Sequence, residues 1–192
     1  ALASLGYSTI KIAVRDSLEE LEDTLSSFSP KNTFIFNNCD GFAGNNLDAV
    51  QVIRLIERMG FKHTGAPAEA IELCIDKPRS KERLIQVGVP TPLYQVFEQP
   101  KGNLCLNLPV IVKPSVEDAS IGIDLGSVIC DMDALFPRVA YVLDNYREPV
   151  VVEEFVPGRE LAVAMCGNET VEILPIAEQD YSLISNPLQW LL

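Results

Sequence analysis

The sequence has few basic residues, a single histidine and no long apolar run. Lysine and arginine number 15 among 192 residues, against 27 aspartates and glutamates, so the formal net charge is −12. This balance excludes a general nucleic-acid binder, because such proteins carry a basic surface. The single histidine, His63, excludes sites built on two histidines. No apolar run approaches the roughly 20 residues that cross a membrane, so we expect no membrane partner.

The signatures of several enzyme classes are also missing. The sequence contains neither a G-x-x-x-x-G-K-[ST] phosphate loop nor a G-x-G-x-x-G stretch after a strand, which excludes two common nucleotide-binding classes. It contains neither G-x-S-x-G nor H-E-x-x-H, and one histidine argues against a Ser/His/Asp triad. These absences considerably narrow the range of possible enzyme classes.

Cysteine usage and the N-terminus indicate a compartment. The five cysteines, at positions 39, 74, 105, 130 and 166, show no close pair of the kind that zinc and redox motifs use. This spread fits reduced, mostly buried thiols. The N-terminus has no methionine and lacks the basic start and apolar core of a signal peptide. We therefore expect a cytoplasmic protein whose chain is processed or truncated.

The sequence does have the composition of a packed protein, and its first part alternates between strand and helix patterns. The chain is 47% hydrophobic and 22% charged, and its length predicts one large domain or two small ones. Residues 9–14 and 33–36 are short β-rich runs, each followed by apolar residues at helical spacing. Ser17 and Glu20 form a capping box, and Gly60 closes the second helix. This order predicts a parallel, Rossmann-like α/β layer.

From Asp76 onward the pattern changes to α+β. A helix is expected from Pro78 to Val87, where Gly88 and two prolines stop it. Gly167-Asn168, between two apolar runs, predicts an antiparallel hairpin. The other elements expected are a helix at 132–145 capped by Asp131 and strands at 93–97, 109–113, 121–129, 150–156, 161–166 and 170–175.

Residues 182–192 fit neither part of the chain. They end in an apolar stretch around Trp190, whereas domain ends are usually polar and exposed. We expect a chain cut inside a domain, with an oligomer contact as the alternative.

Three segments carry features that buried strands do not require. They read D-K-P-R-S-K at 76–81, L-P-V-I-V-K-P-S at 108–115 and V-V-E-E-F-V-P-G-R-E-L at 151–161. Lys113 ends an apolar strand, where its ammonium is costly unless it meets an anion. The polar loop behind it can close over phosphates with backbone N–H groups. With carboxylates at 153, 154 and 160 for an amino group and sugar hydroxyls, these segments predict an ATP cleft between two sheets.

Plainer interpretations of the same residues stay open. Lys113 fits an edge strand in solvent, and Lys77 fits an ordinary charged helix start. Glu153 and Glu154 fit a solvated strand end, and Phe155 fits a core position.

Taken together, the three segments resemble the ATP-grasp family, and within it the D-alanine–D-alanine ligases. The resemblance covers about residues 33–181 and includes the aromatic–x–x–Thr–Gly stretch at 61–65. It implies a partial ATP-grasp fold in three parts. These are a pre-ATP-grasp α/β domain at 1–75, a central nucleotide-binding α+β subdomain at 76–158, and the start of a C-terminal subdomain at 159–192.

The resemblance also implies residue roles at the phosphates. Lys77 and Lys113 would contact the α- and β-phosphates of ATP. Glu117 to Ser120 would form the mobile loop over them. Mg²⁺ is a further implied cofactor, with its ligands expected beyond this chain.

For the base and the ribose, the resemblance implies a second set of residues. Glu153 would accept from the adenine amino group, and Glu160 would hold the ribose hydroxyls. Glu154, Phe155 and Val156 would supply backbone bonds to the adenine edge.

The activity implied is that of a carboxylate–amine ligase in peptidoglycan synthesis. ATP would phosphorylate one D-alanine carboxylate, and the amine of a second D-alanine would attack the acyl phosphate. The expected partners are therefore ATP and a small amino acid, and because such ligases are commonly dimers, a homodimer is a further expectation.

Several departures from the family pattern qualify this expectation. Asp118-Ala119 replaces a Gly-Ser pair, which adds a carboxylate beside the phosphates, and Asn45 stands where the family has a glutamate. Residues 182–185 do not continue the family's D-Y-x-x-K-Y segment, and its metal-binding segment has no counterpart. We therefore expect this chain alone to be inactive. The alternatives are a ligase for another amino acid or peptide, and a non-catalytic nucleotide-binding or structural remnant.

Overall fold

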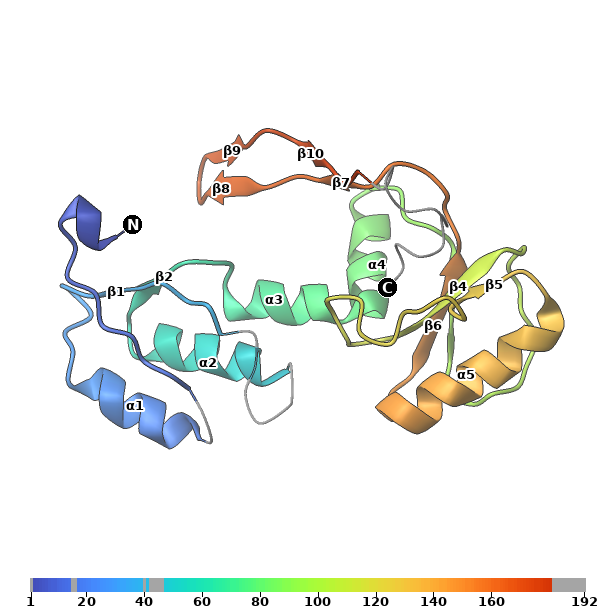
Figure 1. The fold of residues 1–192 in the computed structure, drawn as a ribbon, viewed down its shortest axis with the longest axis horizontal. Coiled ribbons are helices and arrows are strands. Elements are labelled where there is room, and N and C mark those ends of the chain that lie inside the picture. Colours follow the sequence, from blue (N-terminus) through green and yellow to red (C-terminus); the bar gives the residue numbers. More distant parts are fainter. Residues whose placement is uncertain (1, 15–16, 40, 42–46, 181–192) are drawn as a thin grey trace. The chain divides into compact units, whose positions relative to one another are not determined.

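The computed structural model describes residues 2–14, 17–39, 41 and 47–180, and the chain divides into two compact units (Figure 1). The first unit runs to Ser80 and the second begins at Lys81. Within the described residues, no helix is both long and apolar enough to span a membrane. Two features of the sequence analysis, Asn45 and the stretch at 182–192, lie outside the described residues.

The first unit is a small parallel α/β layer. Its strands β1 (Phe34–Ile35) and β2 (Lys62–His63) pair in parallel, as the strand–helix order predicted. Its helices are α1 (Leu18–Ser26), α2 (Leu47–Arg58) and α3 (Ala68–Ile75), after a 3₁₀ turn at Ala3–Leu5. The helix α4 (Lys77–Gln86) crosses the boundary between the units.

The first helix of this unit begins where its capping residue predicted. Ser17 Oγ accepts a hydrogen bond from the Glu20 amide at 3.3 Å and caps α1. This bond confirms the part of the predicted capping box that Ser17 supplies. The apolar face of α1 then packs on α2 in a core that includes Leu21, Leu25 and Leu55.

One expectation for the first unit was wrong, and one helix was not expected. Residues 9–14 form no strand, because Ile12 and Val14 pack against the helical core instead of entering a ladder. The helix α3 was not anticipated. It begins after Pro67, whose residue type suits a helix start, and its Arg54–Glu72 ion pair to α2 spans 2.7 Å.

The second unit is built on a four-stranded antiparallel sheet with strand order β3-β6-β4-β5. This confirms the α+β prediction for this part of the chain. Its strands are β3 (Tyr94–Phe97), β4 (Val110–Pro114), β5 (Val128–Ile129) and β6 (Val150–Glu154). The helix α5 (Met132–Tyr146) starts at Asp131, whose carboxylate accepts from the Asp133 amide at 3.1 Å.

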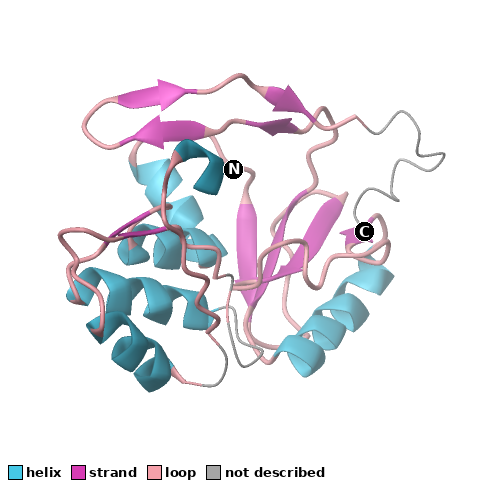
Figure 2. Ribbon diagram, turned by 60° about the vertical axis from the view of Figure 1, so that its left-hand side comes forward, coloured by secondary structure: helices cyan, strands magenta, loops and turns pink. Residues whose placement is uncertain are grey.

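Alternation along β4 and β6 gives the sheet two different faces. Val110, Val112, Val150 and Val152 are fully buried against α5, which lies across that face (Figure 2). The intervening residues of both strands, Lys113 and Glu153 among them, therefore point to the opposite face. The strand register aligns Ile111 with Glu153 and Lys113 with Val151, so the lysine and the glutamate are diagonal neighbours.

The chain then leaves the sheet as a two-stranded ribbon of short antiparallel pairs (Figure 1). The strands β7 (Leu161–Ala162) and β10 (Ala177–Glu178) pair, as do β8 (Met165–Gly167) and β9 (Val171–Ile173). The second pair confirms the hairpin predicted at Gly167-Asn168.

The strand predicted at 121–129 forms only at its end, in β5. Residues 118–127 instead make successive turns, with Ile121 N donating to Asp118 O at 2.8 Å and Ile123 N to Ser120 O at 3.1 Å. The alternating Ile121 and Ile123 resembled a strand, but turn hydrogen bonds already use their amides.

The cysteine prediction was half right. All five cysteines are free, but four of them are exposed and Cys39 is half-buried. Cys130 lies between β5 and α5, and every residue of β8 around Cys166 is exposed. These positions flank the core elements and do not occupy their inward faces.

The second core gives a first testable prediction. Leu135 of α5 is fully buried against the sheet, so Leu135→Ala should lower the free energy of unfolding by about 2–5 kcal/mol. Urea denaturation measures the change. Met132→Ala, on the same helix at 43% exposure, is the control and should stay within about 0.5 kcal/mol of wild type. Equal effects of the two substitutions would contradict the placement of this core.

Candidate functional site

A cleft of about 320 Å³ lies on the face of the sheet opposite α5. It combines the ends of β4 and β6 with the turn after β4 and the chain that follows β6. Its lining residues are Pro92, Ile111, Lys113, Ser120, Ile123, Glu153, Glu154, Phe155, Val156 and Glu160.

The structure gathers most of the sequence-predicted site residues in this one cleft. The seven found there are Lys113, Ser120, Glu153, Glu154, Phe155, Val156 and Glu160. Glu117 is half-buried in the turn region and is not among the lining residues. Lys77 begins α4 and belongs to the first unit, so its predicted phosphate contact stays a prediction.

The carboxylate of Glu153 lies between two lysines. One oxygen accepts from Lys113 Nζ, and the other is 2.6 Å from Lys81 Nζ. Glu153 is only 8% exposed and Lys81 only 7%. Glu153 thus has two cationic partners, while two further carboxylates, Glu154 and Glu160, line the same cleft.

The electrostatics of Glu153 follow from these contacts. Burial alone would raise the pKa of its carboxyl, because a charged group loses hydration there. The charge and hydrogen bond of Lys113, and then those of Lys81, outweigh burial and hold the pKa below its ordinary value. The group is therefore an ionised hydrogen-bond acceptor at neutral pH.

Sequence reasoning missed Lys81 as a site residue. It belongs to the D-K-P-R-S-K segment and follows Lys77 by four residues, a spacing that places both on one face of α4. That spacing was the available signal. What the spacing could not show is that Lys81 also donates to Thr91 Oγ1 at 2.9 Å and to the Pro92 carbonyl at 3.1 Å.

Backbone amides beside the cleft already donate hydrogen bonds within the protein. The Glu154 amide donates to Leu93 O at 3.0 Å and the Phe155 amide to Pro109 O at 3.1 Å. Of the three amides expected to face an adenine edge, two are therefore occupied by the fold. Of these three amides, only that of Val156 has no hydrogen-bond acceptor among the described residues.

The turn over the cleft is anchored by α5. Arg138 donates to the Gly122 carbonyl at 2.9 Å and to Ser127 Oγ at 2.7 Å, and it pairs with Asp124 at 3.0 Å. Ser120 has a positive φ of 63°, a strained conformation for a residue with a side chain. These anchors fix the turn on which Ser120 faces the cleft.

This anchoring gives a second prediction. Arg138→Met removes three hydrogen bonds from a guanidinium group whose side chain is 10% exposed, and it should cost about 1.5–3 kcal/mol of unfolding free energy. Limited proteolysis should then cut within 118–127 faster than in wild type. Arg83→Met, at an exposed position of α4, is the control. An unchanged cleavage rate in the Arg138 variant would contradict the anchoring role.

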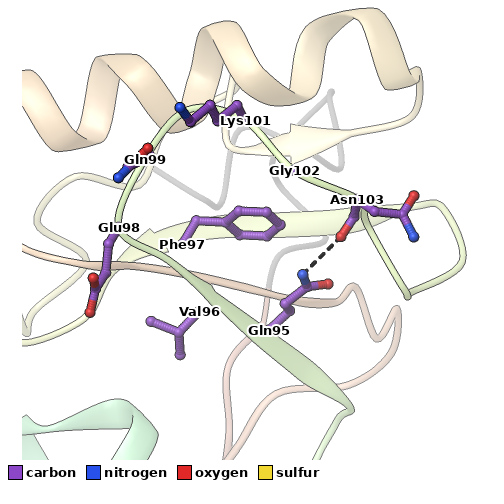
Figure 3. Close-up of a pocket in the computed structure, with 8 residues that line it drawn as sticks. All are labelled: Gln95, Val96, Phe97, Glu98, Gln99, Lys101, Gly102 and Asn103. Atoms are coloured by element: carbon purple, nitrogen blue, oxygen red, sulfur yellow. Dashed lines mark hydrogen bonds between the residues drawn. The ribbon is translucent and has the colours of Figure 1, made fainter.

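A second, wider hollow of about 650 Å³ lies along β3 and the loop that follows it (Figure 3). Gln95 braces this loop, donating to the Asn103 carbonyl at 2.8 Å and accepting from the Cys105 amide at 3.0 Å. Its two charged lining residues, Glu98 and Lys101, are exposed. The hollow therefore lacks the buried, paired charges that distinguish the cleft.

The residues of the described chain do not form a metal site of their own. No group of three His, Cys, Asp or Glu side chains within the described ranges is close enough to hold an ion. These residues alone therefore do not fit the Mg²⁺ that the resemblance implies.

Comparison with known proteins places this geometry in a family. The family model "D-ala D-ala ligase C-terminus" matches residues 85–183. The D-alanine–D-alanine ligase of Pelagibacter ubique is 31% identical over 169 residues, which cover 84% of this chain and 52% of that protein. The chain spans about half the length of the curated relatives it matches.

Solved structures show the same fold. An L-amino acid ligase from Bacillus licheniformis has a TM-score of 0.59 at 22% identity, covering 83% of this chain and 35% of that chain. The Bacillus anthracis D-alanine–D-alanine ligase complexed with ATP has a TM-score of 0.53 at 23% identity. The match covers 66% of this chain and 42% of that chain. The cleft around Glu153 thus lies in a partial ATP-grasp fold, and the chain belongs to the D-alanine–D-alanine ligase family.

Proposed function

We propose that this chain is the ATP-binding portion of a carboxylate–amine ligase. The observation that carries the proposal is the joint presence of Lys113, Glu153 and Glu160 in one cleft. A nucleotide needs a cation for its phosphates, an acceptor for its amino group and an acceptor for its ribose hydroxyls. The solved relative that holds ATP supports the same ligand.

In this proposal the residues act mainly by binding and positioning. Lys113 contacts the phosphates, and the turn from Glu117 to Ser120 covers them. Glu153 accepts from the adenine amino group, and Glu160 from the ribose hydroxyls. The Val156 amide donates to the adenine edge, in place of the three-residue contact expected from the sequence.

The reaction proposed for the complete ligase joins two amino acids. ATP phosphorylates the carboxylate of one, and the amine of the second displaces the phosphate. D-alanine is the substrate that the family name supports. We further propose Mg²⁺ as the cofactor of the complete ligase, a cytoplasmic location and a homodimeric assembly. Because the chain spans about half of its relatives, we propose that it binds nucleotide without turnover by itself.

Calorimetry with ADP tests the proposal. ADP should bind with a dissociation constant of about 1 μM–1 mM, the range of ordinary enzyme substrates, and GDP should bind more weakly. No heat of binding and no thermal shift with either ATP or ADP would contradict the nucleotide site. Release of phosphate from ATP on addition of D-alanine would contradict the absence of turnover.

A further inference from the structure

The two lysines that contact Glu153 are held very differently. Lys81 is 7% exposed, and its ammonium also donates to Thr91 Oγ1 and the Pro92 carbonyl. It lies 5.2 Å from the centre of the Tyr94 ring, which adds a cation–π contact. Moving Lys81 would break all of these contacts at once.

Lys113 is the more exposed of the two. Its side chain is 22% exposed against 9% for Lys81, and it lines the cleft, whereas Lys81 does not. A phosphate that entered the cleft would therefore compete with Glu153 for Lys113. If Lys113 turned to the phosphate, Glu153 would keep Lys81 as its counter-ion.

This division of roles matters because Glu153 is buried. A buried carboxylate without a cation takes up a proton, and a protonated carboxyl donates a hydrogen bond as well as accepting one. An ionised carboxylate only accepts, so it favours a base edge that carries an amino group over one that carries a carbonyl. The ionisable groups around it are Lys81 of α4, Lys113 of β4 and Tyr94 of β3, with Glu154 and Glu160 in the same cleft.

We propose that Lys81 is the positioning residue that fixes Glu153 as an acceptor and thereby selects adenine over 6-oxopurines, while Lys113 exchanges from Glu153 to the nucleotide phosphate. The proposal rests on the nucleotide-binding function proposed above. Lys81 itself touches no nucleotide and acts through Glu153.

The test compares ADP with inosine diphosphate, which has a carbonyl where adenine has its amino group. Wild type should bind ADP about 10- to 100-fold more tightly than inosine diphosphate, the range expected for a hydrogen bond to a charged group. Lys81→Met should reduce this ratio to within about threefold, more so at pH 5 than at pH 7.5, because a protonated Glu153 can donate to the carbonyl. Lys81→Arg should restore most of the ratio, and Lys101→Met, an exposed lysine of the second hollow, should leave it unchanged.

The outcomes separate the two proposals. Wild type that binds neither nucleotide contradicts the proposed function and this inference with it. Wild type that selects ADP, with a Lys81→Met ratio equal to wild type at both pH values, overturns the inference alone. An equal loss of affinity for ADP and inosine diphosphate in Lys81→Met, with the ratio preserved, also overturns the inference. Lys81 would then only support the fold.

A measurement on the unmodified chain covers the case in which Lys81→Met does not fold. Carbon-13 labelling of lysine side chains reports each ammonium separately, and the signals are assigned by through-bond correlation to the backbone amides of the wild-type chain. Addition of ADP should shift the Lys113 signal and leave the Lys81 signal in place. A larger shift at Lys81 than at Lys113 would overturn the exchange.

Discussion

Replacing Glu153 by glutamine should lower the free energy of unfolding by about 3–5 kcal/mol, because it leaves buried cations without their anion. Lys81 is 7% exposed and cannot regain full hydration without leaving its contacts to Thr91 and Pro92. This loss is a large part of the stability of an ordinary domain, which is about 5–15 kcal/mol. Urea denaturation at pH 7 measures it.

The pH dependence gives this prediction a second signature. Because the lysines lower the folded-state pKa of Glu153 below its ordinary value of 4.5, its contribution is present above that value and is lost as pH falls through the folded-state pKa. The stability gap between wild type and Glu153→Gln should therefore stay constant from pH 7 to pH 5.5 and shrink on further acidification. The exposed Glu98→Gln is the control, expected within about 0.5 kcal/mol of wild type. A gap that widens toward low pH would contradict the ion-pair assignment.

Replacing Lys113 by methionine should weaken ADP binding by about 10- to 150-fold, the equivalent of one hydrogen bond to a charged group. The effect should depend on the ligand, because Lys113 is assigned to phosphate and not to the base. Adenosine should bind the variant at least as well as wild type, because Lys113 no longer occupies the Glu153 oxygen that accepts from adenine. Calorimetry with adenosine, AMP and ADP on both proteins measures this dependence.

Two results would contradict the assignment of Lys113. An equal loss for adenosine and ADP would show that methionine disturbs the cleft as a whole. An unchanged ADP affinity would place the phosphates elsewhere. Lys101→Met removes the same charge from an exposed loop outside the cleft, and it should change neither affinity.

The sequence predicted much of the cleft because the family motif falls on strand ends. Lys113 and Glu153 each end or nearly end an apolar run, and alternation places both on the face that α5 does not cover. The diagonal contact between them follows from the strand register, which single-sequence reasoning does not specify. The motif therefore identified the residues, and the register brings them together.

What the sequence did not predict depends on contacts between distant segments. Lys81 becomes a site residue only because Thr91 and Pro92 return beside α4 and β3 pairs with β6 at Tyr94 and Glu153. The turns at 118–127 depend on Arg138, which is far along the chain in α5. Their alternating isoleucines therefore resembled a strand when read locally.

The most direct test of the nucleotide site is a backbone-amide NMR titration of the wild-type chain with ADP. The amide of Val156 should show a large shift, together with those of Lys113 and Ser120, because these residues line the cleft. Amides from Gln95 to Asn103, along the second hollow, should stay in place. Shifts confined to that hollow, or no shifts at millimolar ADP, would contradict the site.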